Sequence, residues 1–275
     1  MAAESDPRGA HDRGRSVLRW DPAQYGRYGS ERARPFFDLI SMVEIDRPRR
    51  VVDLGCGPGD LTATLADRWP DAQVVGIDSS QEMLGAAETQ IDGRGNLRFE
   101  LLDIAEWSPG PEDDVVVTNA ALQWVPGHVD LLRRWLPQLT EGSTFALQVP
   151  GNFGSPSHRL MRELAESPQW RERLRGVLRH DDAVAEPADY LEVMVSAGFA
   201  PQAWETTYLH LLQGANPVLE WVRGTGLRPV LSALGADAAE FETEYSAALV
   251  ANYPANKWGT VYPFRRIFAV GVKTS

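Results

Sequence analysis

The sequence has little of what would mark a disulfide-stabilised, metal-binding or membrane protein. Cys56 is the single cysteine among 275 residues, which excludes an intramolecular disulfide and a zinc site built from several cysteines. The five histidines lack the spacing of a metal site. No run of about 18 apolar residues is present, so no transmembrane helix is expected. We therefore predict a protein without a metal ion, located in the reducing cytoplasm.

Positive charge is also scarce. The chain has 27 basic against 38 acidic side chains, which gives a formal net charge of −11. A surface of that charge repels nucleic acid and anionic membranes, so neither is expected as a partner. An anionic small molecule must then be held locally, by a few arginines aimed at it. With 43% hydrophobic residues, the chain can still form a sizeable core.

Short β-branched apolar segments alternate with helical patterns in the first half of the chain. The expected strands are 50–55, 72–78, 97–104, 114–119 and 143–150. The expected helices between them are 61–69, 81–89 and 129–139. Each strand is apolar on both faces, as in a parallel sheet with helices on either side. The alternation therefore predicts an α/β fold built on a doubly wound, mostly parallel sheet.

The pattern changes after residue 150. Neighbouring strands of a compact sheet usually need a short connection, yet long helical stretches precede the closing strand "VYPFRRIFAVGVKTS". We expect helical cap insertions at about 151–186 and 214–261, lying over the strand ends where ligands of α/β sheets bind. Residues 1–19, rich in Gly, Ser, Asp and Arg, are expected to form a disordered tail. Residues 20–275 then form a single domain.

A glycine-rich turn follows the first expected strand. The stretch "VVDLGCGPGD" has the pattern D-x-G-x-G-x-G, beginning at Asp53 and including Gly55 and Gly57. Glycines here let a ligand approach the backbone closely. A dinucleotide site prefers G-x-G-x-x-G with a helix start aimed at a pyrophosphate, which an acidic residue would repel. Cys56 has no histidine near it in sequence to activate it, so a nucleophilic role is not expected.

Polar residues end the following strands as well. Asp78 ends the second strand, Asp103 ends the third beside Ile104, and Asn119 ends the fourth. A carboxylate at the end of the second strand, here Asp78, can accept hydrogen bonds from both ribose hydroxyls of a nucleoside. Any one of these residues could instead cap the helix that follows it. Together with Asp53 at the end of the first strand, four such residues lie at consecutive strand ends, which favours a binding site.

This constellation resembles the class I S-adenosylmethionine-dependent methyltransferases, a family with a Rossmann-like seven-stranded sheet. The resemblance implies S-adenosylmethionine as the cofactor and S-adenosylhomocysteine as its product. It places the glycine-rich turn at the methionine part, the second strand end at ribose and the third at adenine. The cofactor-binding residues it implies are Asp53, Gly55, Gly57, Asp78, Ser79, Met83, Asp103, Ile104 and Asn119.

Four further segments are similar to the family of trans-aconitate 2-methyltransferases. They are "WDPAQYGRYGSERARP", "NAALQWVPGH", "WVRGTGLRP" and "FRRIF". This resemblance implies an O-methyltransferase that forms the monomethyl ester of a small polycarboxylate, with trans-aconitate as the leading candidate. Two arginines that match family positions are expected to bind carboxylates. Two tyrosines are expected to donate hydrogen bonds from their hydroxyls, and two tryptophans to line the pocket. The substrate-binding candidates are Arg228, Arg266, Tyr208, Tyr262, Trp20 and Trp124.

The chemistry of a carboxylate acceptor needs no general base, because an acid with a pKa of about 4 is already ionised at neutral pH. No catalytic acid or base is therefore predicted. Strand alternation puts Arg266 and its neighbour Arg265 on opposite faces, so we expect Arg265 to pair with a protein carboxylate or water. Open alternatives are another small acid or a hydroxyl-bearing metabolite as acceptor, a nicotinamide-dependent dehydrogenase, and a cofactor-binding protein without turnover.

Overall fold

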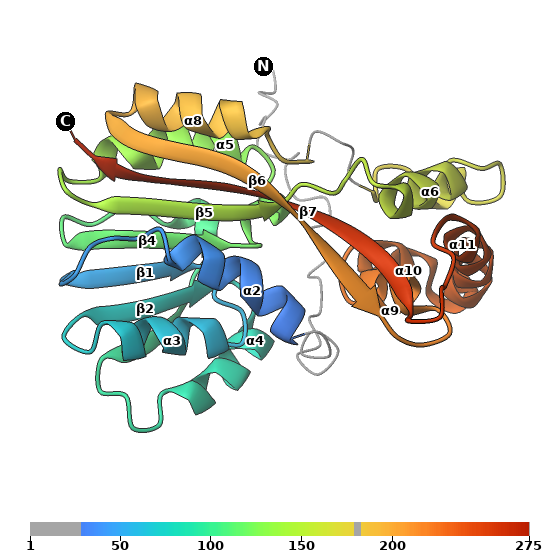
Figure 1. Ribbon diagram of the computed structural model, residues 1–275, viewed down its shortest axis with the longest axis horizontal. Coiled ribbons are helices and arrows are strands. Elements are labelled where there is room, and N and C mark those ends of the chain that lie inside the picture. The colour runs from blue at the N-terminus through green and yellow to red at the C-terminus, as the bar shows by residue number, and fades with distance from the viewer. Residues whose placement is uncertain (1–28, 179–182, 275) are drawn as a thin grey trace, which may run out of the picture.

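The computed structural model describes residues 29–178 and 183–274. These residues form an α/β fold with a seven-stranded sheet in the order β3-β2-β1-β4-β5-β7-β6 (Figure 1). The doubly wound, mostly parallel sheet predicted from the sequence is confirmed. The predicted disordered tail 1–19 and the candidate residue Trp20 lie outside the described residues.

The strands divide into a parallel set and an antiparallel pair. The parallel strands are β1 (Arg50–Leu54), β2 (Gln73–Asp78), β3 (Leu97–Leu101), β4 (Asp113–Asn119) and β5 (Thr144–Pro150). The long strands β6 (Phe199–Leu212) and β7 (Thr260–Lys273) pair antiparallel with each other, and β7 also pairs antiparallel with β5. All five parallel strands therefore present their carboxyl ends at one edge of the sheet, which is where ligands bind in folds of this kind.

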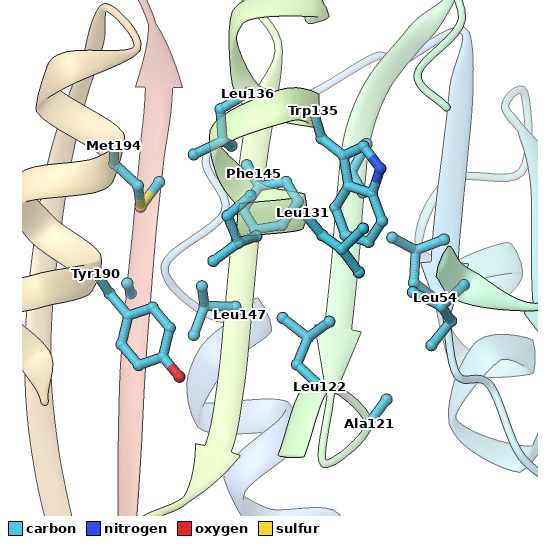
Figure 2. Packing of buried hydrophobic residues seen from close by; sticks show 14 of the residues in the cluster. Leu54, Ala121, Leu122, Leu131, Trp135, Leu136, Phe145, Leu147, Tyr190 and Met194 are labelled. Atoms are coloured by element: carbon cyan, nitrogen blue, oxygen red, sulfur yellow. The ribbon is translucent and has the colours of Figure 1, made fainter. Parts of the chain in front are cut away.

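Helices cover both faces of the sheet. On one face lie α2 (Gly29–Ile40), α3 (Asp60–Arg68) and α4 (Gln81–Ala87) (Figure 1). On the other lie α5 (His128–Trp135) and α8 (Pro187–Ser196). Figure 2 shows how Leu131, Trp135 and Leu136 pack on Phe145 and Leu147 of β5. Both faces of the central strands are thus buried, which explains why their sequences are apolar throughout.

The β6–β7 pair extends past the rest of the sheet and carries a second group of helices. Strand β5 pairs with β7 as far as Arg266, whereas β6 stays paired with β7 to Thr260. On this extension pack α6 (Pro156–Ala165), α7 (Arg171–Leu174), α9 (Pro217–Arg223), α10 (Arg228–Leu234) and α11 (Ala238–Asn252) (Figure 1). We call these helices the cap. The cap has its own buried cluster, which includes Leu212, Tyr262 and Phe264 of the two strands.

Two elements end three or more residues before the sequence prediction, and the other bounds given for the first half of the chain differ by at most two. The strand expected at 97–104 ends at Leu101, because Asp103 accepts a hydrogen bond from Ala105 N (2.8 Å) and caps the short 3₁₀ helix Ile104–Glu106. The helix expected at 129–139 ends as an α-helix at Trp135 and continues as the 3₁₀ turn Leu136–Gln138. In both places local capping and turn chemistry overrode the apolar pattern.

Truncating Phe241 should loosen the cap while leaving the sheet intact. This side chain is fully buried in the cap cluster, with its ring 5.6 Å from that of Trp170. Phe241→Ala should destabilise the cap by about 3–5 kcal/mol, and Phe241→Leu by clearly less. Hydrogen exchange read by mass spectrometry should then show faster exchange in α6, α10 and α11 and unchanged exchange in β1, β4 and β5. Equal acceleration in both regions would contradict a cap with its own core.

Candidate functional site

The glycine-rich turn after β1 is folded in a way that requires glycine. Gly55, Gly57 and Gly59 all have left-handed φ angles, of 82°, 56° and 77°. A Cβ at Gly55 would lie 2.2 Å from Ala121 Cβ, and one at Gly59 would lie 2.6 Å from the Phe99 ring. A Cβ at Gly57 would meet no atom within 4 Å. Two of the glycines are therefore needed for packing, while Gly57 borders open space that a ligand can enter.

Asp78 is fixed at the end of β2. Its two carboxylate oxygens accept hydrogen bonds from the backbone N–H groups of Gly57 (2.9 Å) and Ser80 (2.8 Å). Burial raises its pKa, and these backbone donors oppose the rise. Ser79 beside it is exposed, and Met83 is buried in α4. The turn and the strand end are thus tied together, and the carboxylate is held in place before any ligand arrives.

Asp53 is a buried carboxyl group behind the turn. It is 3% exposed, and its Oδ2 accepts a hydrogen bond from the Thr62 hydroxyl at 2.6 Å. Burial raises its pKa to about 7, Thr62 opposes this, and repulsion from Asp78 adds to it. A cation bound nearby would favour the ionised form. Burial and the same two carboxylates also raise the pKa of Cys56, so its thiol stays protonated and has no nucleophilic character.

Asp103 and Ile104 lie at the turn that follows β3. Asp103 is half-buried and uses Oδ1 to cap the 3₁₀ helix, and Ile104 is buried. The Ile104 Cδ1 atom lies 3.4 Å from where a Cβ would stand at Gly55, which puts Ile104 next to the glycine-rich turn. The structure therefore brings the predicted residues of β1, β2 and β3 together at one edge.

Three polar side chains continue this edge on the face of the sheet that α2 and α3 cover. They are Asn119 of β4, Gln148 of β5 and Arg266 of β7. Arg266 is 5% exposed and donates from Nη1 to Gln148 Oε1 at 3.5 Å, while its guanidinium carbon lies 4.3 Å from the centre of the Phe264 ring. A buried guanidinium is thus held between the sheet and the cap. Sequence reasoning missed Gln148, although a lone polar residue in "STFALQVP" was a usable signal.

The backbone at the end of β4 is strained. Ala120 has a φ of 52°, a left-handed conformation that is uncommon for a residue with a Cβ. Its N–H donates to Gln148 O at 2.9 Å, and its carbonyl accepts from the Gln123 side chain. Strain of this kind persists where the surroundings enforce it and is often found at functional sites. Nothing in the sequence pattern indicated Ala120.

Several buried polar atoms around the ends of β4 and β5 have no hydrogen-bond partner within residues 29–178 and 183–274. On the β4 side these are the acceptor oxygens Asn119 Oδ1 and Gln123 Oε1. On the β5 side they are the amide nitrogens Gln148 Nε2 and Asn152 Nδ2. Buried polar atoms in native proteins nearly always have partners, so this cluster suits a polar ligand.

Two of the other predicted substrate residues lie near Arg266: burial raises the pKa of Tyr208 and of Tyr262, and the charge of Arg266 opposes both rises. Tyr208 of β6 donates its hydroxyl to Asp38 Oδ2 of α2 at 2.6 Å. The Tyr262 hydroxyl lies in the cap, 3.2 Å from Ser157 Oγ. Trp124 is half-buried in the 3₁₀ turn after β4, and Arg228 is the first residue of α10. The roles of these four side chains toward a substrate stay predictions.

Arg265 and Arg266 point to opposite faces of β7, as predicted. Arg265 forms ion pairs with Glu186 and Glu205, which confirms the expected protein carboxylate partners. Strand β7 begins at Thr260, so Arg266 does not lie at its entry. Arg266 lies instead where β7 first meets β5, opposite Pro150.

A metal centre was not found in the described part of the chain. No group of three or more His, Cys, Asp or Glu side chains there is arranged to hold a metal ion. The same residues also contain no helix that is long and apolar enough to cross a bilayer.

Replacing Asp53 by Asn should flatten the pH dependence of stability in the cofactor-free protein. The raised pKa of Asp53 means that its contribution to stability is complete below about pH 4 and is lost as the pH rises through about 7. The wild type should therefore lose more unfolding free energy than Asp53→Asn between about pH 5 and about pH 8, as measured by urea denaturation. Asp60→Asn, which removes an exposed carboxylate that raises the pKa of Asp53 less than burial does, should keep most of the wild-type pH dependence. Identical profiles for all three proteins would contradict the assignment.

Comparison with solved structures identifies the fold. The chain is similar to the YcgJ protein of Bacillus subtilis, with a TM-score of 0.56 and 18% identity over 88% of this chain and 99% of that one. It is also similar to phosphoethanolamine N-methyltransferase 2 of Haemonchus contortus, solved with S-adenosyl-L-methionine, with a TM-score of 0.52 and 15% identity over 88% of this chain and 53% of that one. The fold is that of class I methyltransferases.

Comparison with sequences identifies the family. Residues 51–142 match the family described as "Methyltransferase domain". The trans-aconitate 2-methyltransferase of Streptomyces avermitilis is 56% identical over 94% of this chain and 98% of its own length. The enzyme of that name from Streptomyces coelicolor is 55% identical over 92% and 86%, and that from Mycobacterium tuberculosis is 46% identical over 91% and 95%. The chain therefore belongs to the trans-aconitate 2-methyltransferase family of S-adenosylmethionine-dependent enzymes.

Proposed function

We propose that this protein transfers a methyl group from S-adenosylmethionine to one carboxylate of trans-aconitate, which yields the monomethyl ester and S-adenosylhomocysteine. The observation that carries the proposal is the buried guanidinium of Arg266, hydrogen-bonded to Gln148 at the edge of the sheet where the glycine-rich turn also lies. A buried cation of this kind suits an anionic ligand. The name shared by relatives 46–56% identical to this chain supports trans-aconitate as that ligand.

The residues around the glycine-rich turn fit the cofactor. Gly57 faces open space, and Asp78 presents a fixed carboxylate that can accept hydrogen bonds from ribose hydroxyls. Burial raises the pKa of Asp53 to about 7, and the ammonium of the methionine part would favour its ionised form. Ser79 and Met83 would lie beside the ribose, Asp103 and Ile104 at the adenine, and Asn119 completes the set at the end of β4. When bound, the cofactor supplies an electrophilic methyl group on a positively charged sulfur.

The chain's own contribution to the reaction is binding and orientation. The carboxylate of the acceptor is ionised at neutral pH, so no side chain has to remove a proton from it. What remains is to hold the acid in line with the methyl group in a site closed to water. Arg266 fixes one carboxylate, and the cap provides the cover. In this proposal the cap insertions 151–186 and 214–261 belong to a single domain, 20–275, which acts in the cytoplasm.

The proposed reaction can be tested by an acceptor screen. The purified protein is incubated with S-adenosylmethionine carrying a labelled methyl group and with a panel of tricarboxylates, dicarboxylates, phenols and alcohols. Label should enter trans-aconitate with the highest kcat/KM of the panel, as a base-labile ester. Transfer to a phenol or an alcohol, with none to any acid, would refute the proposal.

Arg266→Ala should impair the use of trans-aconitate and spare the cofactor. Each hydrogen bond from a charged donor is worth about 1.5–3 kcal/mol, so kcat/KM for the acid should fall at least tenfold and chiefly through KM. The Kd for S-adenosylmethionine, measured by calorimetry, should stay within about threefold of the wild type, since β4 and β5 separate Arg266 on β7 from the glycine-rich turn after β1.

Arg265→Ala is the matched control for this experiment. It removes the same charge one residue away, on the face where Glu186 and Glu205 are the partners. It should lower thermal stability slightly and leave kcat/KM for the acid near the wild-type value. Equal losses in the two variants would mean that Arg266 acts through the fold and not through the substrate.

A further inference from the structure

Two buried side-chain amides at the carboxyl end of β5 have donors without partners. Gln148 is completely buried and Asn152 is 4% exposed, and neither Gln148 Nε2 nor Asn152 Nδ2 has a hydrogen-bond partner within the described residues. An amide donor buried in this way destabilises a fold unless something satisfies it, so native proteins keep few of them. Two at one strand end, beside a buried arginine, call for an explanation.

The orientation of Gln148 follows from its contact with Arg266. A guanidinium only donates, so the oxygen of the Gln148 amide must face it, and Nη1 to Oε1 is 3.5 Å. The NH₂ group then points away from the arginine. Gln148 therefore offers a donor of its own in addition to those of Arg266, and both come from the same face of neighbouring strands.

Asn152 brings its donor from the segment that joins β5 to the cap. Its backbone is held on both sides, since Gly151 N donates to Arg265 O and Ser155 N donates to Asn152 O, each at 3.0 Å. Its side chain lies near the Tyr262 hydroxyl. Burial raises the pKa of Tyr262, and Ser157 and the nearby amide of Asn152 oppose part of that rise, although Asn152 Nδ2 does not reach the geometry of a hydrogen bond to this hydroxyl. Asn152 thus stands at the junction of sheet and cap, the place where a substrate covered by the cap must lie.

The unpaired hydrogen-bond acceptors and the unpaired donors lie at different strand ends. Asn119 Oδ1 and Gln123 Oε1, at the end of β4, are acceptors, and the carboxyl group of Asp53 on β1 lies on their side. Gln148 Nε2 and Asn152 Nδ2, at the end of β5, are donors, and Arg266 lies on theirs. The acceptor part suits a cationic group and the donor part suits an anionic one.

We propose that Gln148 and Asn152 donate hydrogen bonds from their side-chain amides to the acceptor acid, next to Arg266, and that they determine the preference for acids with several carboxylates. The proposal rests on the proposed function, methylation of an acid. It adds two neutral donors to the charge of Arg266, so that more than one carboxylate is satisfied at the same strand end.

The test replaces each amide by an apolar side chain of similar size. Gln148→Met and Asn152→Leu should each raise KM for trans-aconitate by roughly tenfold to a hundredfold, the effect of losing one hydrogen bond to a charged group. The loss should be larger for a tricarboxylate than for a dicarboxylate that lacks one of the contacted groups. The Kd for S-adenosylmethionine and the thermal unfolding midpoint show whether each variant is folded.

Thr118→Val is the matched control. Its hydroxyl is also buried and without a partner within the described residues, but alternation along β4 puts it on the opposite face from Asn119. It should leave KM and the preference for tricarboxylates unchanged. If Gln148→Met does not fold, Asn152→Leu and Asn152→Asp in the connecting segment still decide the question.

The outcomes separate this proposal from the one on which it rests. Wild-type transfer to trans-aconitate combined with unchanged KM values in the folded variants would overturn the role of the amides and leave the proposed function standing. An equal loss for tricarboxylates and dicarboxylates would overturn the role in specificity. If the wild type itself transfers label to no acid, the proposed function has failed, and that is evident before any variant is measured.

Discussion

The pairing of β7 with β5 is the constraint on which the rest of the structure depends. Their ladder ends where Arg266 lies opposite Pro150, and from that point β7 continues with β6 alone. The end of the ladder puts the arginine at the edge where the parallel strands finish. The continuation supplies Tyr262 and Phe264 to the core of the cap. One register therefore sets both the position of the buried charge and the position of the helices that cover it.

Charge along this edge is arranged in a gradient. Asp53 and Asp78 make the β1–β2 side acidic, and burial works against the ionised form of both. Arg266 makes the β5–β7 side basic within a protein of net charge −11. A cationic cofactor and an anionic acid would each reduce the electrostatic penalty on their own side and attract each other across the middle. The edge thus favours the two reactants together over either alone.

The sequence was sufficient for features that depend on local pattern. Alternation separated Arg265 from Arg266, and the spacing of the glycine-rich turn marked the end of β1. It was not sufficient for contacts that depend on the register between strands far apart in sequence. Gln148, for example, contacts Arg266, which lies 118 residues later in the chain. The left-handed backbone of Ala120 is enforced by such contacts as well. Asp103 shows the reverse case, in which a local cap ended a strand that the apolar pattern had extended.

The place of β7 in the sheet affects the order in which parts of the protein can fold during synthesis. All five parallel strands precede residue 151 in the chain, whereas β7 follows every other element of the described residues and inserts between β5 and β6. During synthesis, the part that holds the glycine-rich turn can fold first. Arg266 and the cap core join it only when the last strand emerges from the ribosome. In a nascent chain, the cofactor-binding part of the site would thus form early. The part that binds the acceptor acid would form only after β7 has joined the sheet.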